Sequence, residues 1–234
     1  YAMTANSDNL GAAPSARIAG WFAASGAPYA PEMCRRTPAD VKGGHLAVRK
    51  SDGRIILRDT AQTPEDQMHY FTDQFRHPFF HTNNLWFDLK VLRDTLADRG
   101  GILGLPLIRN SKTVDPADSS STPVIQLETA MGAAVEAFEG ATAIEVPRSR
   151  FLPVKTTNDL LLVRSDVYEV DDDGLLQMVP DQACTVSLDP RFYKKIQDFE
   201  ARFPNGVPSI KDAQSLTVEG DWTFGADVVA TGEA

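Results

Sequence analysis

Cysteine and long apolar runs are both scarce in this sequence. Only two of its 234 residues are cysteines, Cys34 and Cys184, which is too few for a disulfide scaffold, and their spacing is not that of zinc ligands. Apolar runs are short, as at Leu160–Val163, whereas a membrane helix needs about 20 apolar residues. We therefore expect free thiols, a reducing compartment such as the cytoplasm, and no membrane partner.

Positive charge is also in short supply. Lys and Arg number 23 against 32 Asp and Glu, which gives a net charge of −9 and an isoelectric point near 4.9. Because the phosphate backbone of a nucleic acid repels so acidic a chain, we expect no nucleic-acid polymer as a partner. A site for a small phosphate compound has to be a local cluster of basic residues.

Familiar catalytic signatures are missing from the sequence. The histidines, at positions 45, 69, 77 and 81, lack metal-ligand spacing, and no Gly-x-Ser-x-Gly, Walker or kinase motif occurs. Neither cysteine has the surroundings of a catalytic nucleophile. The first residue is Tyr1 and no secretory signal peptide is visible, so we expect an internal part of a longer protein.

What is present is the composition of a globular protein, with 42% hydrophobic and 24% charged residues. Strand-like and helical patterns alternate up to about residue 165, which predicts an α/β domain with an open sheet. We expect a hairpin over 43–60 with its turn at Asp52-Gly53, a loop over 115–123, and strands over 124–127 and 143–146. Helices are expected over about 10–25 (capped by Asp8), 85–98 (capped by Asn84), 129–138, 159–167 (capped by Thr157 or Asn158) and 192–203.

The last third of the chain changes in character. Residues 171–190 are acidic and read as irregular, and Leu216–Gly225 has short β-branched pieces separated by glycine, as in the first coil of a solenoid. We therefore divide the chain into an α/β domain over 1–168, a connector with a helix over 169–212, and the beginning of a solenoid-like element over 213–234.

One segment stands out as a basic island. Arg148, Arg150 and Lys155 lie between Val146 and Asn158 with no acidic residue among them. The segment runs from a predicted strand to a predicted helix, which is where open α/β sheets bind ligands, and a lysine there suits a phosphate. The alternative is that the arginines pair with carboxylates on the surface.

Three other segments are candidates for ligand contacts. The amides of Asn83 and Asn84 suit sugar hydroxyls, although Asn84 is explained equally by helix capping. Gly43 and Gly44 permit close approach of a ligand, or form a turn into a strand. Asp8 can hold a metal ion or a ribose hydroxyl, or can simply cap a helix.

Together these strings resemble the eukaryotic-type UTP–glucose-1-phosphate uridylyltransferase (UDP-glucose pyrophosphorylase) family, and they occur in that family's order. The matching segments are Ser7–Ala12, Ala39–Gly44, Thr82–Trp86, Val124–Thr129, Val146–Thr157 and Leu216–Gly225. The string Pro-Arg-Ser-Arg-Phe-Leu-Pro-Val-Lys, which ends at Lys155, is the most specific of them.

The resemblance implies a fold, an activity and a site. The fold is a nucleotide-diphospho-sugar transferase domain, a Rossmann-like (GT-A) mixed sheet with helices on both faces, followed by a left-handed β-helix. The activity is uridylyl transfer from UTP to glucose 1-phosphate with Mg²⁺, giving UDP-glucose and pyrophosphate. Lys155 is the implied catalytic residue and Asp8 the implied metal ligand. The implied substrate-binding residues are Asp8, Asn9, Lys42, Gly43, Gly44, Asn83, Asn84 and Arg148.

The sequence departs from the family pattern in two places. His81 stands where the family usually has asparagine, so a sugar contact there is expected to be altered. The family's N-terminal glycine-rich loop, which cradles the UTP phosphates, is absent. Three alternatives therefore stay open: a pyrophosphorylase for N-acetylhexosamine 1-phosphate, one with a broad range of sugar phosphates, or a non-catalytic fragment that binds sugar nucleotides. Self-association through the β-helix is a further expectation.

Overall fold

A computed structural model of the chain describes residues 1–37, 40, 43–60, 63–116 and 118–234. The chain forms two compact units. Unit 1 contains residues 1–6 and 14–147, and unit 2 contains residues 7–13 and 148–234. Both predicted domain boundaries, at 168 and 212, fall within unit 2, and the predicted three-part division stays a prediction. In the described ranges, every helix is too short or too polar to cross a membrane.

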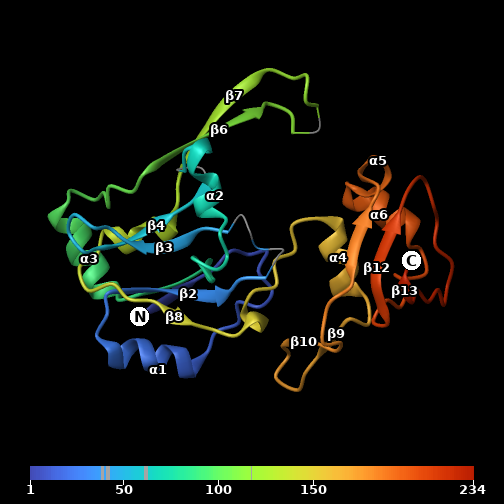
Figure 1. Ribbon diagram of the computed structural model, residues 1–234, viewed down its shortest axis with the longest axis horizontal. Coiled ribbons are helices and arrows are strands. Elements are labelled where there is room, and N and C mark those ends of the chain that lie inside the picture. The colour runs from blue at the N-terminus through green and yellow to red at the C-terminus, as the bar shows by residue number, and fades with distance from the viewer. Residues whose placement is uncertain (38–39, 41–42, 61–62, 117) are drawn as a thin grey trace. The chain divides into compact units, whose positions relative to one another are not determined.

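Unit 1 is built on a mixed four-stranded sheet in the order β1-β5-β2-β8, of which Figure 1 labels β2 and β8. Its strands are β1 (Ala2–Thr4), β2 (Tyr29–Arg35), β5 (Phe79–Phe87) and β8 (Ile144–Glu145). Strand β5 is antiparallel to both of its neighbours, whereas β2 and β8 are parallel. The prediction of a mixed α/β fold is therefore confirmed, and β8 lies where a strand was predicted.

Helix α1 (Ala16–Ser25) covers one face of this sheet (Figure 1). The helix begins later than predicted, because the Ser15 hydroxyl, and not Asp8, accepts the N-terminal N–H of Ile18. Its end is as predicted: Gly26 closes the helix at φ 65°, a left-handed conformation that glycine adopts without strain.

The predicted hairpin over 43–60 is confirmed and covers the other face of the sheet. It consists of β3 (His45–Val48) and β4 (Ile55–Arg58), and Gly53 makes the turn at φ 73°. Leu57 packs there with Tyr29, Leu85 and Phe87 of the central strands. A turn of η3 (Glu65–Gln67) and α2 (Met68–Phe71) follows the hairpin.

The predicted helix over 85–98 is wrong in its first turn. Residues 85–87 are the end of β5, and helix α3 spans Leu89–Asp98, capped by Asp88 and not by Asn84. The Asp88 carboxylate accepts the N–H groups of Lys90 and Val91. Because consecutive residues at 85–87 are all buried, they fit a central strand with two covered faces better than one helical stripe.

A long hairpin follows α3, made of β6 (Leu107–Thr113) and β7 (Pro123–Thr129). Strand β7 was predicted over 124–127, whereas β6 was not; the predicted loop over 115–123 includes residue 117, which lies outside the described residues, and its last residue belongs to β7. The predicted helix over 129–138 is a 3₁₀ helix, η4 (Met131–Glu136), whose small residues lie in the core of unit 1.

Unit 2 starts with η5 (Arg148–Arg150) and helix α4 (Thr157–Arg164). The cap of α4 is Thr156, one residue earlier than predicted, in a capping box with Asp159. A hairpin of β9 (Tyr168–Val170) and β10 (Leu176–Met178) follows, and the prediction that 171–190 is irregular is wrong in part, because β10 and a further strand over Thr185–Leu188 lie in it.

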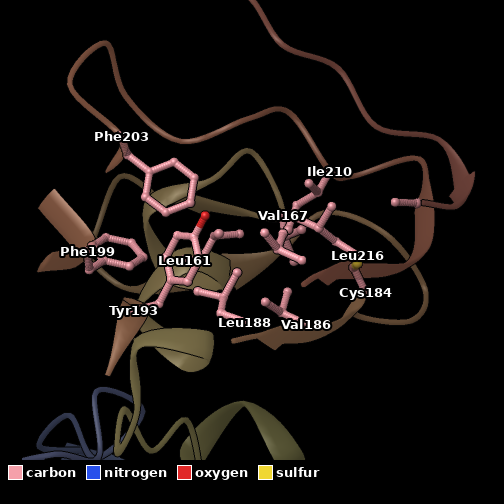
Figure 2. Packing of buried hydrophobic residues seen from close by; sticks show 12 residues of the cluster. Leu161, Val167, Cys184, Val186, Leu188, Tyr193, Phe199, Phe203, Ile210 and Leu216 are labelled. Carbon is pink, nitrogen blue, oxygen red and sulfur yellow. The ribbon is translucent and has the colours of Figure 1, made fainter. Parts of the chain in front are cut away.

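A three-stranded parallel sheet completes unit 2. Its strands are β11 (Thr185–Leu188), β12 (Ala213–Val218) and β13 (Gly232–Glu233). The predicted helix over 192–203 is two helices, α5 (Pro190–Tyr193) and α6 (Ile196–Arg202), because Lys195 between them is extended. Figure 2 shows Tyr193 and Phe199, one from each helix, in the same apolar core as Leu161 and Leu216.

Candidate functional site

Two segments that lie far apart in the sequence, residues 8–10 and 152–154, pair inside unit 2. The N–H of Val154 donates to the carbonyl oxygen of Asp8 at 2.8 Å, and the N–H of Leu10 donates to that of Leu152 at 2.9 Å. Asn9 and Pro153 form an isolated antiparallel bridge between these bonds. The pairing places Asp8 opposite the residue that precedes Lys155, so the two predicted phosphate-site residues belong to one local structure.

Asn9 holds this pairing together from within. Its side-chain oxygen accepts the N–H of Leu152 at 2.8 Å and that of Gly11 at 3.2 Å, and its amide nitrogen donates to the carbonyl of Arg150 at 3.1 Å. The side chain is buried. These three bonds give Asn9 a structural role, and its contact with a substrate stays a prediction.

Gly11 allows the two segments to approach closely. A Cβ atom at this position would overlap the carbonyl oxygen of Ser149 and lie 2.8 Å from the backbone nitrogen of Phe151. Since backbone atoms cannot rotate away, only glycine fits here. The predicted string Ser7–Ala12 is therefore explained in large part by packing against the segment that begins at Arg148.

The Asp8 carboxylate has an orphaned oxygen. Its Oδ1 atom is buried and has no hydrogen-bond partner among the described residues. A buried carboxylate oxygen without a partner is costly, and a bound cation or hydrogen-bond donor removes that cost. No group of three or more His, Cys, Asp or Glu side chains that could hold a metal occurs in the described part of the chain, so any ion at Asp8 would need oxygen ligands from elsewhere.

The three cations of the basic island have different surroundings. The Arg150 guanidinium donates to the carbonyl of Ala13 at 2.8 Å, and that of Arg148 lies 5.2 Å from the ring centre of Phe151. Lys155 is exposed, and its ammonium makes no ion pair with any residue that the structure describes. Lys155 is thus the cation that is available to an anionic ligand.

The predicted glycine pair lies in unit 1, at the entry to β3. A Cβ atom at Gly43 would come within 3.0 Å of the Phe80 side chain, and one at Gly44 within 3.1 Å of the Arg58 carbonyl. Close packing therefore accounts for both glycines, and their contact with a sugar stays a prediction. Lys42, the third candidate of this motif, lies outside the described residues.

Strand β5 contains a bulge at the predicted asparagine pair. Pro31 pairs with Leu85 and Met33 pairs with His81, so the single residue Glu32 faces the three residues 82–84. The middle residue of the three, Asn83, has φ 63°, a left-handed conformation that asparagine tolerates better than most residues. Bulges of this kind redirect a side chain out of the regular strand.

Asn84 anchors the bulge in the core. It is fully buried, and its amide nitrogen donates to Oε2 of Glu32 at 2.9 Å, while the Trp86 indole donates to Oε1 at 2.9 Å. The Thr82 hydroxyl donates to the Glu32 carbonyl at 2.8 Å. The predicted capping role of Asn84 is wrong, and its predicted substrate contact stays a prediction. Glu32, which no sequence pattern indicated, is the centre of this network.

Asn83 and His81 lie on the partly exposed side of the bulge. The Asn83 amide nitrogen donates to Oδ1 of Asn6 at 2.6 Å. The N–H of Asn83 donates to Nδ1 of His81 at 3.1 Å, so the proton of this neutral imidazole is on Nε2, which is buried and without a partner among the described residues. Burial lowers the pKa of His81 to about 4.

A cavity of about 330 Å³ lies elsewhere in unit 1, between His45, His77, Phe79 and Glu145. His45 is buried, its ring stacks on that of His77 at 3.8 Å, and its Nδ1 lies 3.4 Å from the Arg36 guanidinium. Burial, and then the charges of His77, Arg36 and Arg58, lower the pKa of His45 to about 3. Sequence patterns did not reveal this histidine pair.

Comparison with known proteins shows the family to which this chain belongs. The family profile described as UTP–glucose-1-phosphate uridylyltransferase matches residues 1–230. This chain belongs to that family. The UTP–glucose-1-phosphate uridylyltransferase of Hordeum vulgare is 42% identical over 235 residues, which are 99% of this chain and 47% of the barley protein. The Saccharomyces cerevisiae protein of the same name is 39% identical over 233 residues, or 98% of this chain and 45% of the yeast protein.

Solved structures of the uridylyltransferase family agree in fold. A Trypanosoma brucei structure named UDP-glucose phosphorylase matches with a TM-score of 0.86 and 43% identity, covering 99% of this chain and 50% of that one. A Leishmania major UDP-glucose pyrophosphorylase variant in complex with UDP-glucose matches with a TM-score of 0.83 and 45% identity, covering 99% and 51%. This chain spans about half the length of the curated relatives it matches.

Proposed function

We propose that the protein to which this sequence belongs transfers the uridylyl group of UTP to glucose 1-phosphate, giving UDP-glucose and pyrophosphate. The observation that supports the proposal most directly is the Asp8–Val154 pairing. It brings together, in one local structure of a chain whose net charge is −9, a carboxylate oxygen and an exposed ammonium that have no partner among the described residues. Family membership and the UDP-glucose bound to the Leishmania relative support the choice of substrates.

The chemistry asks little covalent work of these residues. A phosphate oxygen of glucose 1-phosphate attacks the α-phosphorus of UTP in line, a new P–O bond forms, and the bond to the leaving pyrophosphate breaks. The attacking phosphate is already ionised, so no general base is needed. Positioning and charge neutralisation dominate such a transfer, and Lys155 supplies a compact positive charge to the phosphates, with Arg148 nearby in the same unit.

Asp8 fits the role of a Mg²⁺ ligand. Mg²⁺ prefers oxygen ligands and is commonly held by one or two carboxylates together with substrate phosphates, and Oδ1 of Asp8 is a buried oxygen without a partner among the described residues. When bound, Mg²⁺ would neutralise phosphate charge and orient the leaving group. The Asp8 backbone is fixed by its bond to Val154, so the carboxylate is held ready before the ion arrives.

The remaining parts of the proposal concern the sugar, the assembly and the compartment. We assign Asn83, Gly43 and Gly44 to binding of the sugar. The parallel strands β11, β12 and β13 support a β-helix that begins in this region, and we propose that this β-helix mediates self-association. Both cysteines are free and buried, which supports a reducing, cytoplasmic location.

A substrate panel tests the proposed function. The full-length protein is assayed for pyrophosphate release with UTP, Mg²⁺ and each of glucose 1-phosphate, N-acetylglucosamine 1-phosphate and galactose 1-phosphate. We expect glucose 1-phosphate to give the highest kcat/KM. Preference for N-acetylglucosamine 1-phosphate, or comparable rates with all three, would select one of the alternative pyrophosphorylases. Binding of UDP-glucose without turnover would indicate a non-catalytic protein.

A further inference from the structure

The bulge in β5 directs Asn83 out of the strand, and the conformation of Asn83 depends on the side chain of His81, two residues earlier. Asn83 is held at φ 63°, and a left-handed residue within a strand persists only when its surroundings fix it. Two of the fixing contacts come from the buried side: the Thr82 hydroxyl accepts the N–H of Asn84 at 3.2 Å, and the Asn84 amide is bound to Glu32. The N–H of Asn83 itself donates to Nδ1 of His81.

We propose that His81 is a positioning residue for sugar binding in unit 1, acting through the backbone of Asn83. The proposal rests on the proposed function in assigning Asn83 to the sugar. His81 Nδ1 accepts the Asn83 N–H at 3.1 Å, which closes a local ring over residues 81–83 like the turn that an asparagine or aspartate side chain makes with the residue two positions later. The imidazole thereby sets the direction in which the Asn83 amide leaves the strand.

The imidazole can do this because its own position is fixed. The N–H of His81 donates to the Gly44 carbonyl at 2.7 Å, which ties the residue to the entry of β3. On the other side the ring lies so close to Gly132 that a Cβ atom there would be 2.8 Å from its Cε1 atom and 3.0 Å from the Leu57 side chain. Gly132 therefore leaves the space that the ring fills.

The hydrogen bond to the Asn83 N–H requires an acceptor atom at the δ position of residue 81. Nδ1 of histidine and Oδ1 of asparagine are the same number of bonds from Cα, whereas Oε1 of glutamine is one bond farther. His81→Asn therefore keeps an acceptor for the Asn83 N–H, and His81→Gln is a matched amide that does not. If the histidine ring contacted the sugar directly, the two amide variants would be impaired alike.

Two measurements on the full-length protein test this. The first is the hydrogen-exchange rate of the backbone N–H of Asn83 in the absence of substrate. The second is the KM for glucose 1-phosphate, with the KM for UTP and kcat as internal controls. We expect His81→Gln to raise the Asn83 exchange rate and the KM for glucose 1-phosphate each about tenfold, the size that loss of one hydrogen bond gives. We expect kcat and the KM for UTP to stay within about twofold, and His81→Asn to restore both readouts.

Gly132→Ala supplies an independent test from the other side of the ring. Its new Cβ atom collides with Cε1 of His81, so it should raise the Asn83 exchange rate in the natural background. In the His81→Asn background that atom is gone, and the same substitution should have a much smaller effect on exchange.

The possible results distinguish failure of this proposal from failure of the proposed function. Equal behaviour of His81→Asn and His81→Gln, or an unchanged Asn83 exchange rate in His81→Gln, overturns the proposal. Loss of Asn83 protection in His81→Asn overturns it as well, even if His81→Gln fails to fold. If the protein lacks uridylyl transfer, the proposed function fails, and the exchange measurements still decide whether His81 positions Asn83.

Discussion

The carbonyl oxygen of Asp8 accepts a hydrogen bond from the N–H of Val154, and this one bond places the carboxylate of Asp8 beside the backbone that leads into Lys155. Neither side chain is occupied by the bond, since it joins backbone atoms only. The bond thus holds the two residues in one local structure and engages neither of the two charged groups.

Removal of the Lys155 ammonium should affect catalysis and not folding. We expect Lys155→Ala in the full-length protein to lower kcat about 10² to 10³-fold, as when a preorganised charge is removed from a transition state. The melting temperature should stay within about 1 °C, because an exposed side chain without an ion pair adds little stability. Lys211→Ala, at another exposed lysine of unit 2, is the control and should change neither kcat nor melting. Equal turnover of Lys155→Ala and the natural protein would remove Lys155 from the mechanism.

Replacement of the Asp8 carboxylate by an amide should separate metal binding from stability. Asp8→Asn removes a buried charge whose Oδ1 has no partner in the described structure, so the free energy of unfolding should be unchanged or slightly higher. The Mg²⁺ concentration needed for half-maximal activity should rise at least about tenfold. Urea unfolding and a Mg²⁺ titration of activity measure the two effects. A large loss of stability with an unchanged Mg²⁺ requirement would show that Asp8 is purely structural.

Gly11→Ala should destabilise the protein through backbone overlap. The new Cβ atom meets the Ser149 carbonyl and the Phe151 backbone nitrogen, neither of which can move without opening the pairing with residues 148–154. We expect a loss of about 2–3 kcal/mol in the free energy of unfolding, the upper range for overpacking. Gly225→Ala is the matched control, because a Cβ atom there would have no neighbour within 4 Å. Similar denaturation midpoints for the two variants would contradict the close approach.

Stability should fall on mild acidification because two imidazoles have pKa values well below the ordinary value. The pKa of His81 is lowered to about 4 and that of His45 to about 3 from the ordinary value of 6.5. Between 6.5 and these values the unfolded chain binds protons that the folded chain does not, so the contribution is fully present above pH 6.5 and is lost as the pH falls. Each imidazole should cost about 2 kcal/mol between pH 7 and pH 5.

Unfolding by urea at pH 7 and pH 5 measures this loss. His81→Asn should remove about half of it, since the substitution leaves His45 as the remaining strongly shifted imidazole. His69→Asn, at an exposed histidine, serves as the control. An undiminished pH dependence in His81→Asn would mean that His81 is accessible to protons in the folded protein.

Local patterns predicted the parts of the fold that depend on neighbours in sequence. The hairpin over 43–60 was predicted because its alternation and its Asp-Gly turn lie within one short segment. The start of α3 was not, because Leu85 satisfies both a helical stripe and a buried strand, and only the two covered faces of the sheet decide between them. Strand β6 was missed because its residues are mostly exposed and show no apolar alternation.

The candidate site divides in the same way. The resemblance to the family named Asp8 and Lys155, and the structure places both in one local arrangement. Other features depend on partners that the spacing of residues in the sequence does not reveal. They are the structural roles of Asn9 and Gly11, the burial of Asn84 against Glu32, and the hydrogen bond between His81 and Asn83. Residues that pack together from distant positions carry no periodic signal.

The order in which the ribosome makes this chain has a consequence for unit 2. Residues 7–13 are synthesised before most of unit 1, whereas residues 148–154, to which they bond, follow only after all of unit 1. During synthesis the early piece has no bonding partner until that later stretch emerges, although domains usually fold as they are made. Completion of unit 2 is thereby delayed until most of unit 1 has been translated.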